Sequence, residues 1–281
     1  MVEINEIHIK DNIIGQTQKT FIIAEAGINH NGDIETAKKM IIEAKKAGAD
    51  AVKFQTYITE KRVPKDSEIY GILKKCELSN EQTRELNEFS KEQGIIFFST
   101  PFDKESVDLL CEIGIPVFKL ASFDIINKDL LKYVASKKKP VIFSRGMANE
   151  EEIKEAISIL DNENVNYALL HCVSSYPTKK EDANLNIIKT LKKKFSCPIG
   201  YSDHTMGIEV PLLAVAAGAC IIEKHFTLDK NMEGPDHKLS CEPQDLKEFV
   251  QEVRKMESIM GNEDIRLIDC EKPTVPYRRK G

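Results

Sequence analysis

Short apolar segments recur along the chain, and segments with the periodicity of amphipathic helices separate them. The apolar segments are rich in β-branched and aromatic residues and do not alternate with polar residues. This pattern predicts strands that are buried on both faces, as in a parallel sheet. Eight such segments occur, at residues 21–27, 51–56, 95–100, 117–122, 140–146, 167–172, 198–204 and 220–226.

The segments between these strands carry the usual signals of helix starts. Ser79 lies three residues before Gln82, and Asn149 lies three residues before Glu152, which is the spacing of a capping box. A helix follows every strand, so the chain predicts a closed (β/α)8 barrel. An open, doubly wound sheet is the alternative, although no G-x-G-x-x-G sequence follows any of the eight strands.

Three segments fall outside the repeating pattern. Residues 4–19 alternate polar and apolar positions and predict a small hairpin that plugs the floor of the barrel. Residues 57–79 form a long connection after the second strand, at the end where barrel active sites lie, and predict a lid. Residues 265–281 contain prolines and a basic end and predict a linker or docking tail, which leaves residues 1–264 as one catalytic barrel.

Composition narrows the class of protein. Charged residues make up 30% of the chain, both signs are interspersed and the net charge is -5, so the chain predicts no binding to nucleic acid. The chain shows no secretory leader and no stretch that could cross a membrane, which predicts a cytoplasmic protein without a membrane partner. The seven cysteines form no C-x-x-C pair and predict reduced structural thiols.

Polar residues gather at the carboxyl ends of the predicted strands, which is where (β/α)8 barrels place their active sites. A single polar residue at a strand end is more often a cap or a solvated loop side chain. Here every strand contributes, which favours a site. The strand-end residues that we single out are Glu25, Lys53, Gln55, Thr100, Lys119, Ser122, Ser144, Tyr176, Ser202, His204, Glu223 and His225.

The spacing of these residues gives a finer test. Residues two apart on a strand point to the same face. Three pairs are therefore predicted to face the barrel lumen together: Lys53 with Gln55, Ser202 with His204, and Glu223 with His225. By the same rule His171 and the adjacent Cys172 point to opposite faces, which argues against a Cys–His nucleophile.

Two lysines inside a barrel are costly unless they meet opposite charge. A ligand with a phosphate and a carboxylate would satisfy both Lys53 and Lys119. Hydroxyls of Ser122 and Ser144, with backbone N–H groups near Gly146, could complete a cradle for the anion. The alternative is that each lysine pairs with one of the two strand-end glutamates.

The two strand-end histidines allow a divalent metal site. His204 and His225 end neighbouring strands, and imidazole nitrogens are common metal ligands. Two ligands alone are a weak pattern, and a hydrogen-bonded structural role is the alternative. In the Gly-Pro turn after the last strand, Asp236 and His237 could lie over the barrel mouth, or could serve the turn alone.

Several long segments resemble the sialic acid synthase family, which includes N-acetylneuraminate synthases, synthases of legionaminic and pseudaminic acids and the related spore-coat polysaccharide synthases. The resemblance runs across nearly the whole chain. It is carried by AEAGINHNGD (24–33), VKFQTY (52–57), STPFD (99–103), FKLAS (118–122), FSRGM (143–147), LHCVSSYPT (170–178), GYSDHT (200–205) and EKHFTLDKNMEGPDH (223–237).

The resemblance implies an activity, the condensation of phosphoenolpyruvate with N-acetylmannosamine or a related N-acetylated hexose, and a homodimer. It implies that phosphoenolpyruvate is held by Lys53, Thr100, Lys119, Ser122, Ser144 and Ser202. It implies Mn2+ or Mg2+ as the cofactor on His204 and His225, with Glu223 beside the metal. The acceptor sugar would face Glu25, Gln55, Tyr176 and Asp236, with Glu25 also near the attacking water.

The sequence departs from the family pattern in three places. Ser174 replaces a common asparagine, and Arg145 replaces a common small residue, so the identity of the acceptor sugar is open. The family also usually carries a C-terminal antifreeze-like domain, and the sequence stops where that domain is expected to begin. Two other classes remain open: a lysine Schiff-base aldolase, and a barrel that binds phosphoenolpyruvate or a sugar acid without turnover.

Overall fold

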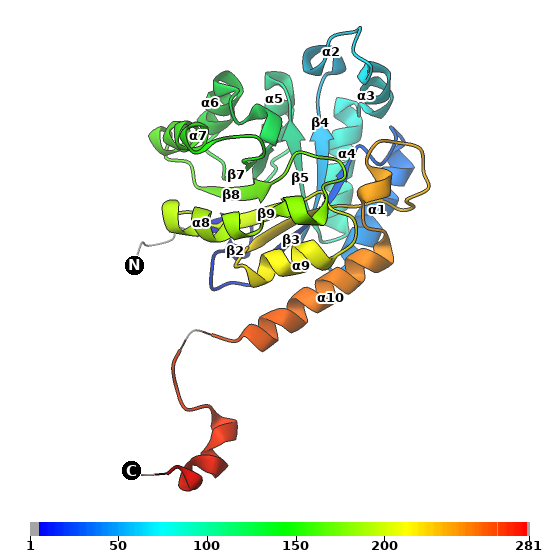
Figure 1. The fold of residues 1–281 in the computed structure, drawn as a ribbon. Coiled ribbons are helices and arrows are strands. Elements are labelled where there is room, and N and C mark those ends of the chain that lie inside the picture. The colour runs from blue at the N-terminus through cyan, green and yellow to red at the C-terminus, as the bar shows by residue number, and fades with distance from the viewer. Residues whose placement is uncertain (1–5, 263, 280–281) are drawn as a thin grey trace.

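The computed structural model describes residues 6–262 and 264–279. Within them, eight parallel strands form a nearly closed barrel, in the hydrogen-bonded order β5-β4-β3-β10-β9-β8-β7-β6, and β5 lies beside β6 (Figure 1). The predicted (β/α)8 barrel is thus confirmed. Its strands are β3 (Phe21–Gly27), β4 (Ala51–Thr56), β5 (Ile96–Pro101), β6 (Phe118–Leu120), β7 (Val141–Ser144), β8 (Tyr167–Cys172), β9 (Ile199–Asp203) and β10 (Ile221–His225).

The strands lie where the apolar segments predict them, and nearly all of their residues are buried. β6 is shorter than predicted because the chain turns into a short 3-10 helix, η1 (Ser122–Asp124), directly after it. This early turn brings Ser122 to the carboxyl end of the barrel. Apolar side chains on both faces of the strands fill the lumen and the contact with the outer helices.

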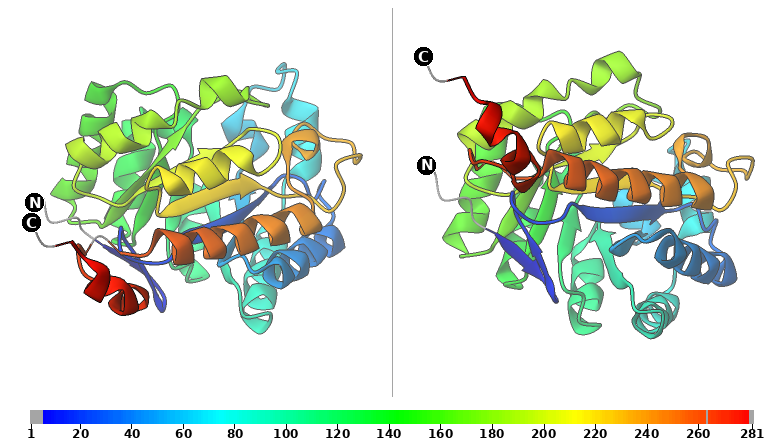
Figure 2. Two further views of the ribbon diagram at one scale, coloured as in Figure 1. Left: turned by 60° about the horizontal axis from the view of Figure 1, so that its bottom comes forward. Right: turned by 90° about the horizontal axis from the view of Figure 1, so that it is seen from below.

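Helices cover the outside of the barrel (Figure 2). The expected capping boxes are present at Ser79 with Gln82 and at Asn149 with Glu152. The major helices are α1 (Ile34–Ala47), α4 (Asn80–Glu92), α5 (Lys104–Glu112), α6 (Lys128–Ser136), α7 (Glu150–Asn162), α8 (Asn186–Lys194), α9 (Glu209–Ala216) and α10 (Pro243–Met260). Short 3-10 helices η2 (Lys180–Ala183) and η3 (His237–Leu239) lie in the connections after β8 and β10.

The N-terminal hairpin is formed by β1 (Ile7–Ile9) and β2 (Asn12–Ile14), which pair antiparallel. The isoleucines Ile7, Ile9 and Ile14 are fully or almost fully buried in the same core as the barrel strands, so the hairpin seals apolar surface rather than standing free. Positions 4 and 5 of the predicted hairpin lie outside the described residues.

The connection after β4 contains α2 (Thr59–Arg62) and α3 (Tyr70–Cys76), which stand above the carboxyl ends of the strands (Figure 1). A small apolar cluster of Ile28, Tyr57, Leu73 and Cys76 fixes this connection to the barrel. Its position agrees with the predicted lid, whereas lid movement stays a prediction.

After α10 the chain continues into η4 (Asp269–Tyr277), which extends away from the barrel in Figure 1 and is mostly exposed. The linker or docking role of this tail stays a prediction, and residues 280 and 281 lie outside the described part of the chain. In residues 6–262 and 264–279, no helix combines the length and the apolar character that crossing a membrane requires.

Candidate active site

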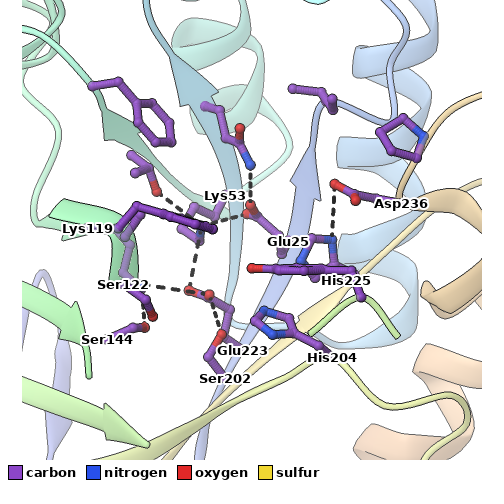
Figure 3. Close-up of a pocket in the computed structure, with 18 of the residues that line it drawn as sticks. Glu25, Lys53, Lys119, Ser122, Ser144, Ser202, His204, Glu223, His225 and Asp236 are labelled. Carbon is purple, nitrogen blue, oxygen red and sulfur yellow. Dashed lines mark hydrogen bonds and ion pairs between the residues drawn. The ribbon is translucent and has the colours of Figure 1, made fainter. Parts of the chain in front are cut away.

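One cavity of about 260 Å³ opens at the carboxyl ends of the strands, and every site residue singled out from the sequence lines it (Figure 3). The residues come from all eight strands or the segments that follow them directly. They are Glu25, Lys53, Gln55, Thr100, Lys119, Ser122, Ser144, Tyr176, Ser202, His204, Glu223, His225 and Asp236.

The strand alternation used in the sequence analysis is confirmed. Both members of each predicted pair line the cavity, because their side chains project from the same face of β4, β9 and β10. Cys172 also lines the cavity, whereas His171 points away and its Nε2 lies 2.8 Å from the carbonyl oxygen of Ala183. The two residues therefore form no Cys–His pair, as predicted.

The buried lysines meet carboxylates, which is the alternative that the sequence left open. Lys53 Nζ lies 2.8 Å from Glu25 Oε2 and 3.6 Å from Glu223 Oε2. Lys119 Nζ lies 3.8 Å from Glu223 Oε1. Lys53 also donates to Thr100 Oγ1 at 3.1 Å, and Ser202 donates to Glu223 Oε1 at 2.8 Å. The two positive and two negative charges balance within one network.

The network shifts the pKa values of the two glutamates in opposite directions. Burial raises the pKa of Glu25, helped by the negative charge of Glu223, and the attraction of Lys53 only partly offsets this. Burial also opposes ionisation of Glu223, but Lys119 and Lys53 outweigh it and hold the pKa of Glu223 below its ordinary value. Burial lowers the pKa of Lys119. Glu25 is therefore the carboxylate closer to exchanging a proton near neutral pH.

Hydroxyl groups converge beside Lys119. Its ammonium donates to Ser144 Oγ at 2.7 Å and to the carbonyl oxygen of Leu120 at 3.0 Å. A Cβ atom at Gly146 would lie 2.6 Å from Ser122 Oγ and 2.4 Å from Ser174 Oγ, so only glycine leaves room for both hydroxyls. This group of donors suits the oxygens of a phosphate or carboxylate.

The two residue differences from the family pattern, Ser174 and Arg145, lie in different environments. Ser174 Oγ is buried, has no hydrogen-bond partner and lies beside Gly146 at the hydroxyl cluster. Arg145 does not line the cavity, because its side chain lies on the outer face of β8, with Nε 3.4 Å from His171 Nδ1. Arg145 is therefore not placed to contact a ligand in this cavity, so its departure from the family pattern does not bear on the acceptor sugar through direct contact.

The two histidines lie together on the opposite side of the cavity, with ring centroids 5.4 Å apart, and Tyr176 packs against both. His204 Nδ1 lies 2.7 Å from the carbonyl oxygen of Val173, which leaves Nε2 for a ligand. His225 Nδ1 is buried without a hydrogen-bond partner and lies 3.8 Å from Asp236 Oδ2.

This donor set fits a divalent cation with two imidazole ligands, the remaining positions being filled by water or substrate oxygens. Within the described residues, no group of three or more His, Cys, Asp or Glu side chains is placed to hold a metal ion. Burial lowers the pKa of His225 well below its ordinary value, and the positive charges of Lys53, Lys224 and Lys119 act in the same direction. His225 is therefore neutral, the form in which imidazole binds metals.

A second set of buried charges holds His204 in place from outside the lumen. Lys224 Nζ lies 2.6 Å from Asp203 Oδ2 and also donates to the carbonyl oxygen of Thr205. Asp203 Oδ1 in turn accepts from the Thr205 hydroxyl at 2.9 Å and from its backbone N–H at 3.1 Å. Both neighbours of His204 are thus fixed, and its side chain is left facing the cavity.

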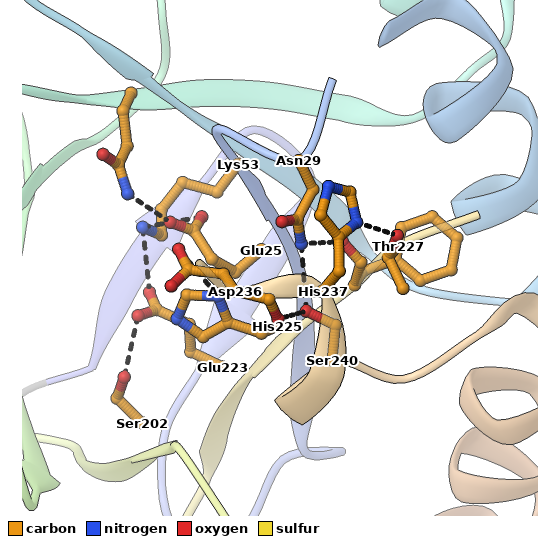
Figure 4. Close-up of polar contacts among 12 residues, drawn as sticks. Glu25, Asn29, Lys53, Ser202, Glu223, His225, Thr227, Asp236, His237 and Ser240 are labelled. Carbon is orange, nitrogen blue, oxygen red and sulfur yellow. Dashed lines mark hydrogen bonds and ion pairs between the residues drawn. The ribbon is translucent and has the colours of Figure 1, made fainter. Parts of the chain in front are cut away.

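The turn after β10 places Asp236 but not His237 in the cavity (Figure 4). Asn29 Nδ2 donates to Ser240 Oγ at 2.9 Å, and Ser240 Oγ donates to the Asp236 carbonyl oxygen at 2.6 Å, which fixes the turn. His237 does not line the cavity and is fully buried with Nδ1 2.7 Å from Thr227 Oγ1, so of the two possibilities left open, the structure shows the role within the turn. The hydroxyl of Thr227 holds the ring behind the turn.

The cavity also has walls that the sequence analysis missed. Arg62 from α2 and Cys172 from β8 line it, and apolar side chains form its outer wall: Ile28, Ile69, Ile72, Leu73, Phe102 and Phe123. Most of these residues lie on loops or short helices, where the period of a strand or a long helix gives no orientation. For a basic or apolar residue in a long connection, the sequence does not indicate whether the side chain faces the cavity or the solvent.

Comparisons with known proteins agree with this geometry. A family model described as NeuB family matches residues 40–265. The chain is 44% identical over 278 residues to N,N'-diacetyllegionaminic acid synthase of Legionella pneumophila, with 92% of this chain and 78% of that protein covered. It is 39% identical over 272 residues to N-acetylneuraminate-9-phosphate synthase of Homo sapiens, with 92% and 76% covered.

A solved structure matches over almost the whole chain. The N-acetylneuraminic acid synthetase of Leptospira borgpetersenii serovar Hardjo-bovis, solved in complex with citrate, has a TM-score of 0.95 and 44% sequence identity. The match covers 98% of this chain and 96% of that one. The barrel fold, and 44% of the aligned residues, are therefore shared with a protein named as a synthetase of an acidic sugar.

Proposed function

The chain belongs to the NeuB family, and on that premise we propose that it condenses phosphoenolpyruvate with N-acetylmannosamine, or a related N-acetylated hexose, and water. The products are a nonulosonic acid and phosphate. The observation that carries the proposal is the single cavity in which two buried lysines, a cluster of hydroxyls and two histidines meet.

In this proposal phosphoenolpyruvate lies between Lys53 and Lys119. The hydroxyls of Thr100, Ser122, Ser144 and Ser202 donate to its phosphate and carboxylate oxygens. An anion here would compete with Glu25 and Glu223 for the lysines, so binding rearranges the ion pairs of the network. The lysines then hold the enolpyruvate in place and offset its negative charge.

The acceptor sugar lies on the other side of the cavity, against Gln55, Tyr176 and Asp236. A divalent cation, Mn2+ or Mg2+, held by His204 and His225, would supply Lewis acidity toward the aldehyde oxygen of the open-chain sugar. Glu223 lies between the two halves, within 4 Å of both lysines. Its place supports a role in keeping the charges of the site balanced while the reaction proceeds.

The chemistry follows from this placement. C3 of phosphoenolpyruvate attacks the aldehyde carbon and makes the new C–C bond, while the C=O double bond opens to an alkoxide that takes up a proton. This leaves an oxocarbenium-like centre at C2. Water adds to C2 as Glu25 takes its proton. The bond between C2 and the bridging oxygen then breaks, phosphate leaves with that oxygen, and the hydroxyl on C2 gives up its proton to the departing phosphate and becomes the ketone of the product. The raised pKa of Glu25 suits a base that must accept a proton near neutral pH.

A lysine Schiff-base aldolase is the second candidate, because burial lowers the pKa of Lys119 and so favours its neutral, nucleophilic form. Borohydride reduction in the presence of pyruvate distinguishes the two. A covalent adduct on Lys119 would support the aldolase, whereas no adduct, together with phosphate release, supports the condensation.

The main test is phosphate release from phosphoenolpyruvate with Mn2+, using N-acetylmannosamine and diacetamido-trideoxy hexoses as acceptors. Release that depends on one acceptor supports the proposal and identifies the substrate. Chelation should abolish release, and added Mn2+ should restore it. Tight binding of phosphoenolpyruvate without release for any acceptor would instead support a binding module.

A further inference from the structure

Arg62, the last residue of α2, reaches the cavity from the connection after β4. Its Nη1 donates to Gln55 Oε1 at 3.0 Å. Its guanidinium carbon lies 3.7 Å from the ring centroid of Phe102 and 4.5 Å from that of Tyr57. A hydrogen bond and two cation–π contacts therefore fix the group in one orientation.

Within the described residues, the charge of Arg62 is not paired with a carboxylate, whereas the charges of the two cavity lysines are. Each cavity lysine has a glutamate oxygen within 4 Å. Within residues 6–262 and 264–279, Arg62 has no carboxylate oxygen within that distance, and Gln55 is the one acceptor of its hydrogen bonds. A guanidinium carries five N–H donors, so four remain for a ligand.

The residues around Arg62 indicate which kind of ligand would accept its free N–H groups. Gln55, which it contacts, belongs to the acceptor side of the proposed site. The carboxylate of Asp236 lines the same cavity as Arg62 and would repel a phosphate group bound on this side. Ile69, Ile72 and Phe123 form an apolar wall of the same cavity.

We infer that Arg62 contacts the acceptor sugar, donating to its hydroxyl or N-acetyl oxygens, and that this half of the cavity accepts a neutral N-acylated sugar rather than a sugar phosphate. The inference rests on the proposed function. The apolar wall would contact the methyl groups of the N-acyl substituents. Arg62 is thus a specificity-determining residue that lies outside the phosphoenolpyruvate cradle.

The test separates the two substrates. Arg62→Met removes the donors and keeps a long apolar side chain, and Arg62→Lys keeps the charge without the planar fork. For Arg62→Met we expect the KM of the acceptor to rise about 10- to 100-fold, as for loss of a hydrogen bond to a charged group, with the KM of phosphoenolpyruvate nearly unchanged. Arg62→Lys should recover only part of the loss.

The matched control is Arg84→Met, since Arg84 is exposed and pairs with Glu112 outside the cavity. It should change neither KM. Equal rises in both KM values for Arg62→Met would make Arg62 part of the anion site and overturn the inference. A lower melting temperature with both KM values unchanged would make it structural, with the same consequence.

A second arm tests the charge of the acceptor. The wild-type enzyme should use N-acetylmannosamine in preference to its 6-phosphate. Preference for the phosphate, lost in Arg62→Met, would overturn the neutral-acceptor part of the inference. A wild-type protein that releases no phosphate with any acceptor would overturn the proposed function and the inference together, whereas normal turnover by Arg62→Met would remove the inference alone.

Discussion

Strands β9 and β10 carry buried charges on both faces, and the two faces differ in how well those charges are paired. On the outer face, Lys224 and Asp203 are fully buried 2.6 Å apart, and Thr205 satisfies the atoms that remain. On the lumen face, Glu223 faces two lysines at 3.6 and 3.8 Å, and its Oε2 has no hydrogen-bond partner.

The difference separates charges that are paired within the fold from charges that are available to a ligand. A saturated ion pair leaves no donor or acceptor for a ligand, and it holds its two strands in one register. Around Glu223 the longer distances to the lysines and the unpartnered oxygen make it easier for a lysine to exchange this carboxylate for an oxygen of a ligand. Two charged residues that are adjacent on β10 thus differ: Lys224 is paired within the fold on one face, and Glu223 lies in the cavity of the proposed reaction on the other.

The largest effect should come from breaking the saturated pair. Lys224→Met leaves Asp203 buried without a counter-charge, so the free energy of unfolding should fall by about 3–5 kcal/mol. Urea denaturation measures this. The double variant Lys224→Met with Asp203→Leu should recover much of the loss, because neither charge then remains. A loss below about 1 kcal/mol in the single variant would show that the pair is not structural.

Glu25→Gln should have the next largest effect, on turnover rather than on stability. It keeps the shape of the side chain but removes the base, so kcat should fall by about 100-fold or more. The KM of phosphoenolpyruvate should change much less. Steady-state kinetics with each substrate varied in turn provides the measurement. Equal losses in kcat and in phosphoenolpyruvate affinity would count against the assigned role.

The pH profile of kcat tests the difference between the two glutamates, because the pKa of Glu25 is raised and that of Glu223 is lowered. In the proposed mechanism Glu25 acts in its deprotonated form. Burial and the charge of Glu223 raise its pKa, while the charge of Lys53 lowers it in part. Activity should therefore be lost, as the pH falls, at a higher pH than the ordinary glutamate value of 4.5. The residual activity of Glu25→Gln should lack this acid limb. An identical limb in the variant would assign it to another group.

The smallest effect should come from an exposed ion pair. Lys61 pairs with Glu105 at the surface, next in sequence to Arg62. Solvent screens such pairs, so Lys61→Ala should change the free energy of unfolding by less than about 1 kcal/mol and leave turnover unchanged. A large loss of activity would mean that the connection as a whole, rather than the Arg62 side chain, positions the acceptor.

Much of the barrel and its site could be predicted from the sequence because local rules act on consecutive residues. Apolar segments predicted the strands, and the two-residue period predicted that Lys53, Ser202 and Glu223 face the lumen. Parallel strands in a barrel bring their carboxyl ends to one rim, so side chains far apart in the sequence could be expected to meet.

Only the tertiary structure decided the rest, since it depends on contacts between segments with no fixed period. Arg62 lines the cavity because Phe102, which follows β5, and Tyr57, in the same connection as Arg62, hold its guanidinium there. His237 turns away from the cavity because Thr227 captures its ring. Local spacing determined which residues could face the lumen, whereas long-range packing and pairing determined which loop residues join them and which charges stay free to bind.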